Sequence, residues 1–93
     1  MGYNELIFRV HAIQRMFERD ISEVDVRGVL ENGEQIASYP EDLPFPSRLM
    51  LGRCRGRYVH VLASDDPTAR ATVVVTVYIP DPQRWDAAFR RRR

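Results

Sequence analysis

Four side chains in the second half of the chain have the types needed for metal-free cleavage of RNA. Such cleavage needs a base for the 2′-hydroxyl group, an acid for the leaving oxygen and cations around the phosphate. Histidine suits either proton-transfer step, so the candidate catalytic residues are His60, Tyr78 and the phosphate-binding Arg53. Tyr58 is a candidate for contacting nucleic acid or a partner. The alternative is that His60 is a strand histidine on a solvated face, beside cross-strand aromatic residues.

A second group of candidate residues lies near the N-terminus. His11, Arg15 and Arg19 recur at a spacing of four, which places them on one side of a helix. Such a stripe could contact phosphates or receive an acidic segment of a partner protein. The alternative is an architectural role, with these side chains paired to nearby acids. We take the three residues as candidates for nucleic-acid or partner binding.

The sequence gives little support for a metal site, a thiol nucleophile or a phosphate-binding loop. The chain has two histidines and one cysteine, none at the spacing of zinc ligands. Cys54 and His60 are expected on opposite faces of a hairpin, which argues against a thiol nucleophile. No glycine-rich phosphate loop is present. We expect no metal and no other cofactor.

The positions of these residues depend on three β-rich runs within residues 48–80. A two-residue turn at Arg55-Gly56 would pair Cys54 with Arg57, and alternation would then set the two faces of the hairpin. One face would carry Arg53, Tyr58 and His60 together with three leucines, Leu49, Leu51 and Leu62. In the third run we expect the all-apolar set to face the core, leaving His60 and Tyr78 outward together; that set is Val73, Val75, Val77 and Ile79.

The first third of the chain predicts a short strand and two helices. Residues 4–10 fit a strand or a helix start, and we favour a strand that runs into a helix near His11. We expect the inward side of that helix to be lined by Ile13, Met16 and Phe17. Asp20 should end it, and Ser22 with Asp25 should cap a second helix that ends at Asn32-Gly33.

The remaining segments complete the expected layout. Residues 34–39 read as an edge strand, and the proline-rich residues 40–46 as a surface loop. Asp81-Pro82 predicts the start of a short C-terminal helix whose apolar side would carry Trp85, Ala88 and Phe89. The prediction is an α+β domain over residues 1–93, with two N-terminal helices on one face of an antiparallel sheet. We expect four strands, or five if residues 4–10 form one.

Composition excludes some classes of protein. The chain is 44% hydrophobic and 29% charged, as in an ordinary globular domain, and it lacks an apolar run long enough to span a membrane. A lone cysteine gives no disulfide framework, so we expect a cytoplasmic protein. All 14 basic residues are arginines, yet the net charge is only +1. Charge alone therefore does not indicate a nucleic-acid partner.

One long stretch carries a family resemblance. Residues 11–22 read HAIQRMFERDIS, followed by a helix ending in Asn32-Gly33, a proline-containing loop, a strand reading TVYIP and then Trp85. This order resembles the bacterial domain-of-unknown-function 4258 family, except that Asp20 replaces the usual glycine. That family is similar in layout to the RelE/ParE-like toxin superfamily, including BrnT-type toxins. The resemblance implies a toxin-like fold that acts on RNA or the ribosome and is held by an antitoxin.

Two functions remain open on this basis. The first is a toxin of a toxin–antitoxin pair that binds RNA or the ribosome and acts as a metal-free ribonuclease. The alternative is a noncatalytic interaction domain that forms a homodimer or binds a partner protein through the leucine-bearing sheet face, since exposed leucines need a cover.

Overall fold

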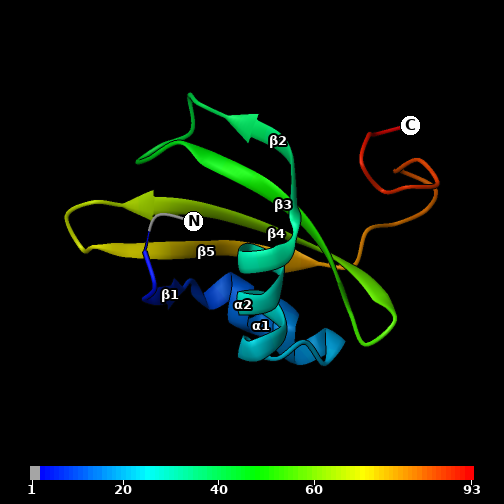
Figure 1. Cartoon of the computed structure of the whole chain (residues 1–93), viewed down its shortest axis with the longest axis horizontal. Coiled ribbons are helices and arrows are strands. Elements are labelled where there is room, and N and C mark those ends of the chain that lie inside the picture. The colour runs from blue at the N-terminus through cyan, green and yellow to red at the C-terminus, as the bar shows by residue number, and fades with distance from the viewer. Residues whose placement is uncertain (1–2) are drawn as a thin grey trace.

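The computed structural model describes residues 3–93. Two helices pack on one face of a five-stranded sheet (Figure 1), which confirms the predicted α+β class and the two N-terminal helices. The elements in chain order are β1 (Leu6–Phe8), α1 (Val10–Arg19), α2 (Glu23–Asn32), β2 (Glu34–Tyr39), β3 (Ser47–Cys54), β4 (Arg57–Asp66) and β5 (Ala71–Tyr78). Over the described residues, neither helix has the length and apolar character that crossing a membrane requires.

The sheet is mixed, not fully antiparallel as predicted. Its strand order is β1-β5-β4-β3-β2, and β2 to β5 form antiparallel neighbours. β1 pairs in parallel with β5, with Leu6 beside Thr72 and Phe8 beside Val74. β1 is joined to β5 by no hairpin turn, because two helices and three strands separate them in the chain, so nothing requires this pair to be antiparallel.

The β3–β4 hairpin has the predicted register. Cys54 pairs with Arg57, and Met50 pairs with Val61. The two turn residues have positive φ angles, 52° at Arg55 and 82° at Gly56. Two-residue hairpin turns favour such angles because they match the twist of the strands. His60 therefore lies on the face opposite the helices, directly across from Tyr78 of β5.

The alternation predicted for β5 is only half right. Leu62 pairs with Thr76, but the next residue of β4, Ala63, pairs with Val74, so Val75 is an extra residue in the ladder. Such a bulge reverses which residues face each side of the sheet. Val77 and Ile79 face the helices as expected, whereas Val74, not Val73 or Val75, joins the core.

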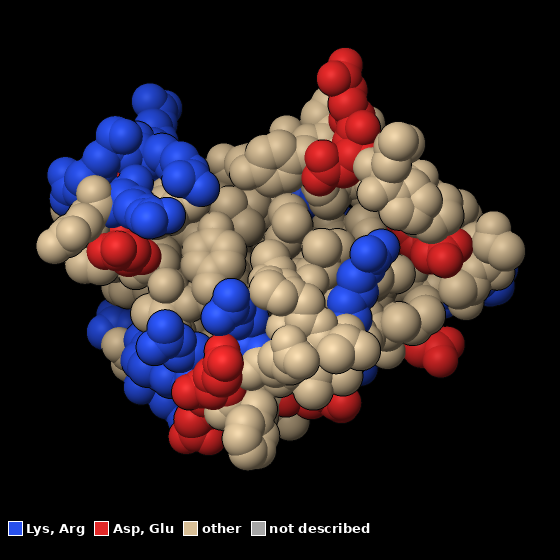
Figure 2. All heavy atoms as spheres, turned by 180° about the vertical axis from the view of Figure 1, so that it is seen from behind, with Lys and Arg blue, Asp and Glu red and all other residues tan. Residues whose placement is uncertain are grey.

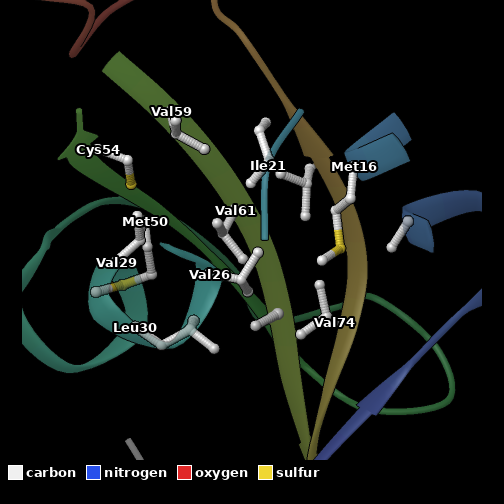
Figure 3. Close-up of a cluster of buried hydrophobic side chains, with 13 residues drawn as sticks. Met16, Ile21, Val26, Val29, Leu30, Met50, Cys54, Val59, Val61 and Val74 are labelled. Atoms are coloured by element: carbon white, nitrogen blue, oxygen red, sulfur yellow. The ribbon is translucent and has the colours of Figure 1, made fainter. Parts of the chain in front are cut away.

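The core lies between the helices and the sheet (Figure 3), and it corrects the expected inward side of α1. Ala12 and Met16 are buried, whereas Ile13 and Phe17 are exposed, Phe17 to 89%. The small side chain of Ala12, which has no exposed surface, lets the helix lie close to β5. The helix therefore turns its Ala12 side to the sheet and leaves its bulkier apolar side in solvent.

The ends of the helices follow the sequence signals. Ser22 and Asp25 form a capping box at the start of α2, where each side chain binds the other residue's backbone N–H. Asp20 ends α1 in the left-handed region, with φ 55° and ψ 52°. Arg55 and Arg57 from the hairpin turn donate to the Asp20 carbonyl oxygen, which satisfies an acceptor at the negative end of the helix.

The predicted C-terminal helix is absent. After β5 the chain makes one turn, in which the Asp81 carbonyl accepts from the N–H groups of Arg84 and Trp85. It then reverses, so that Trp85 bridges to Arg92. Phe89 has φ 59°, which no right-handed helix accommodates. This C-terminal segment (residues 81–93) reaches the sheet face opposite the helices and binds His60 there.

Candidate functional site

A hollow of about 420 Å³ opens between α1, the end of β5 and the C-terminal segment. In Figure 2 basic side chains stand on two sides of its floor. The α1 side carries the predicted stripe of His11, Arg15 and Arg19. The floor and the other side are formed by Thr76, Val77, Tyr78, Ile79, Asp81, Arg84, Trp85 and Arg92.

The hollow is strongly cationic. Four arginines line it, two from α1 and two from the C-terminal segment, against the single carboxylate of Asp81. One oxygen of that carboxylate already accepts the Gln83 N–H at 2.8 Å. Arg15 also pairs with Glu18 at 3.2 Å, but both side chains are about half exposed, so this pair offsets little of the charge. Guanidinium groups in such a hollow suit phosphate oxygens, which they can bind in pairs.

Trp85 secures the C-terminal side of the hollow. Its side chain is 7% exposed, and the guanidinium carbon of Arg92 lies 5.3 Å from the ring centroid. Trp85 also contacts the His60 ring in a T-shaped arrangement, with the ring centroids 4.5 Å apart. Through these contacts Trp85 joins the C-terminal segment to the sheet and places Arg92 beside the hollow.

His60 lies behind the hollow with no exposed surface. Its Nε2 is 2.8 Å from the Phe89 carbonyl oxygen, and its Nδ1 is 3.1 Å from the Tyr78 hydroxyl. A carbonyl oxygen only accepts hydrogen bonds, so Nε2 carries the proton and donates it. Burial lowers the pKa of His60, against the opposing effect of the bond to Phe89, so the imidazole is neutral at pH 7.

Tyr78 connects this buried histidine to the hollow. Its hydroxyl donates to Nδ1 of His60, and Tyr78 is among the residues that line the hollow. Burial raises the pKa of Tyr78, and Tyr39 raises it further, while the nearby Arg92 charge lowers it. The phenol is therefore protonated at neutral pH.

The comparison with protein families supplies an identification. The model of a family described as "Domain of unknown function (DUF4258)" matches residues 8–79. The chain belongs to this family. No curated protein and no solved structure matches it. The matched range holds the α1 stripe and Tyr78, whereas the C-terminal side of the hollow lies beyond it.

In this DUF4258 domain the predicted site residues fall into two places. The stripe of His11, Arg15 and Arg19 lines the hollow together with Tyr78. Arg53 and Tyr58 do not line it: the Arg53 guanidinium lies 5.3 Å from the Tyr58 ring centroid. The Tyr58 ring in turn packs 5.1 Å from that of Phe89. The structure thus separates Arg53 from Tyr78 and buries His60 between the sheet and the C-terminal segment.

Sequence reasoning missed the contribution of the C-terminal segment to the hollow. Asp81, Arg84 and Arg92 were not among the candidates, because this segment was expected to form a short helix and not to reverse toward α1. The available signal was Trp85 followed by Phe89, two large aromatic residues that need a surface to cover. Over residues 3–93 no cluster of three or more histidine, cysteine or acidic residues could hold a metal ion.

We expect His60 to make the fold less stable under mildly acidic conditions. Its folded-state pKa lies below its ordinary value of 6.5, so the unfolded chain binds a proton more readily as the pH falls. The free energy of unfolding should decrease between about pH 7 and pH 5, by at most about 1.4 kcal/mol per pH unit. The lowered pKa values of Asp25, Glu34 and Asp86 act at more acidic pH. Urea denaturation of the parent and of His60→Gln at several pH values checks this. If the free energy of unfolding changes equally with pH in the two proteins, the prediction is wrong.

Proposed function

We propose that this DUF4258 domain is a toxin-like protein that binds RNA, free or within the ribosome, through the basic hollow. The observation that carries the proposal is the meeting of four arginines from two distant parts of the chain around one concave surface. α1 contributes Arg15 and Arg19, and the C-terminal segment contributes Arg84 and Arg92. A volume of about 420 Å³ exceeds the space of a single phosphate and suits a nucleotide unit of a longer strand.

The overall charge does not oppose this proposal. A net charge of +1 is low for a nucleic-acid-binding protein, but the relevant quantity is the local field at the contact surface. Concave surfaces of one charge sign raise the local concentration of oppositely charged ligands. An antitoxin partner that covers the hollow with acidic side chains would be attracted by the same positive charge.

Cleavage of the bound RNA stays a prediction. The catalytic set proposed from the sequence was His60, Tyr78 and Arg53, and of these Tyr78 alone lines the hollow. His60 is buried behind it, so its contribution would pass through the Tyr78 hydroxyl. The proposal therefore rests on binding and not on turnover.

The test is a titration of a fluorescently labelled single-stranded RNA, followed by fluorescence anisotropy at several salt concentrations. If all four arginines contact phosphates, the plot of log K against log salt should have a slope of about −3, since each contact contributes about −0.7 for single strands. No binding at low salt up to about 100 µM protein would remove the proposal, because even nonspecific binders reach that affinity.

A noncatalytic interaction domain remains the second candidate, on a different surface from the one expected. Leu49 and Leu51 are buried, 3% and 5% exposed, and Leu62 is partly buried, so the leucine-bearing face offers little apolar surface to a partner. α1 instead exposes Val10, Ile13 and Phe17 at 70%, 52% and 89%. These residues recur at helical spacing and form an apolar stripe that a second copy of the chain or an antitoxin could cover.

Sedimentation distinguishes this candidate from the RNA-binding one. An interaction domain should form a dimer or a partner complex that Phe17→Glu dissociates, and it should show no affinity for RNA. Leu43→Glu is the matched control, because Leu43 is 90% exposed on the loop before β3. A parent protein that is monomeric and binds RNA would exclude the homodimer form of this reading.

A further inference from the structure

The hydrogen bonds behind the hollow have a fixed direction. The Phe89 carbonyl can only accept, so it takes the Nε2 proton of His60 at 2.8 Å. The neutral imidazole then has a lone pair at Nδ1 and no second proton. The Tyr78 hydroxyl, 3.1 Å away, must donate to that lone pair. Both hydrogen-bond donors, the Tyr78 hydroxyl and the Nε2–H of His60, are therefore bound to partners inside the protein.

This direction determines what Tyr78 can offer a ligand. With its proton held by His60, the phenol oxygen retains only its capacity to accept a hydrogen bond. It cannot donate to a phosphate oxygen, which is itself only an acceptor. The arginines of the hollow have the opposite character, because guanidinium groups donate and never accept. The hollow thus combines several donors for an anion with two acceptors, the Asp81 carboxylate at its side and the Tyr78 oxygen, whose direction is fixed by His60.

Among nucleic acids, RNA meets this combination better than DNA. Each RNA nucleotide carries a 2′-hydroxyl donor close to its phosphate, whereas DNA has no donor on its sugar. A strand whose phosphates contact the arginines would place a sugar near the hollow's floor, where Tyr78 lies. The bases offer donors too, but these are shared by both polymers and so do not distinguish them.

We propose that Tyr78 is a specificity-determining residue that selects RNA over DNA by accepting a hydrogen bond from a ribose 2′-hydroxyl group. His60 is the positioning residue, since it holds the Tyr78 proton away from the ligand. This inference rests on the proposed function, because it requires that a nucleic-acid strand enters the hollow. It adds to that function the polymer class and the residue that distinguishes it.

The first test changes the ligand and leaves the protein intact. Three single strands of one sequence are compared by anisotropy at one salt concentration: RNA, DNA and 2′-fluoro RNA, which keeps the ribose-like sugar shape but lacks the donor. RNA should bind about fivefold more tightly than the other two, as expected for one neutral hydrogen bond. Equal affinity of RNA and 2′-fluoro RNA would overturn the inference.

The second test removes the acceptor. Tyr78→Phe should reduce RNA affinity to the DNA level while DNA affinity stays unchanged. Tyr3→Phe is the control, since it also removes a phenol hydroxyl but Tyr3 does not line the hollow. It should keep the RNA preference. Circular dichroism checks that Tyr78→Phe is folded, and the 2′-fluoro comparison tests the need for the 2′-hydroxyl donor with the unaltered protein.

The outcomes separate this inference from the function on which it rests. If the parent binds RNA and DNA equally well, the role of Tyr78 is refuted while nucleic-acid binding stands. If neither polymer binds, the proposed function and the inference both fall. If Tyr78→Phe is folded and still prefers RNA, the discrimination lies elsewhere in the hollow, and the assignment to Tyr78 is wrong.

Discussion

Replacing Gly33 with alanine is expected to destabilise the domain by about 1–3 kcal/mol or more, as overpacked sites do. A Cβ atom at this position would lie 2.6 Å from the Leu51 carbonyl oxygen and would also press against the Val29 carbonyl oxygen. Both are backbone atoms of neighbouring elements, so neither can move away as a flexible side chain could. The Gly33 φ angle of −78° is open to any residue, so the constraint is space and not backbone conformation.

Gly28→Ala provides the matched control for this substitution. Gly28 lies in the middle of α2, and a Cβ atom there would meet no other atom within 4 Å. Alanine has the higher helix propensity, so this variant should gain about 0.5–1 kcal/mol. Urea denaturation of both variants measures the two effects. A Gly33→Ala protein as stable as the parent would mean that α2 and β3 are farther apart than the structure places them.

The elements that sequence predicted well are those specified by neighbouring residues. The β3–β4 register follows from Arg55-Gly56 alone, because a two-residue turn fixes every pair that follows it. The start of α2 follows from Ser22 and Asp25, whose side chains bind each other's backbone. His60 and Tyr78 were correctly predicted on one face of the sheet, away from the helices, because both predictions depended on local alternation.

The features that sequence could not supply depend on contacts between distant residues. The bulge at Val75 has no local signal in a run of valines and threonines, since each of these residues suits either face. The inward side of α1 was misjudged because size favoured Phe17, whereas packing favoured the close approach that Ala12 permits. In α1 the helical periodicity was right and the choice of face was wrong, whereas in β5 the face was right at Val77 and Ile79 and the bulge interrupts the alternation before them.

The candidate site shows the same division. Helical spacing was sufficient to group His11, Arg15 and Arg19, and the structure keeps them together at the hollow. The opposite side required the chain to reverse after β5, through a left-handed residue at Phe89 and an ion pair between Arg90 and Glu34. That ion pair joins residues 56 apart in sequence, which no local pattern predicts.

Removal of one arginine from each side of the hollow should weaken RNA binding by about 100-fold or more. In the double variant Arg19→Ala/Arg84→Ala, two charge-assisted contacts of about 1.5–3 kcal/mol each are lost. The slope of log K against log salt should become shallower by about 1.4, since two phosphate contacts disappear. Both side chains are exposed and the Arg90–Glu34 pair stays intact, so stability should change little.

Arg70→Glu is the control that separates local contacts from total charge. It changes the net charge by the same two units as the double variant, yet Arg70 lies in the turn between β4 and β5, at the end of the sheet away from the C-terminal segment (Figure 1). A long-range field alone would make the two proteins lose equal affinity, especially at low salt. Direct phosphate contacts predict a large loss for the double variant and a small one for Arg70→Glu. Equal losses would show that RNA is attracted by the whole molecule and that the hollow is not its binding site.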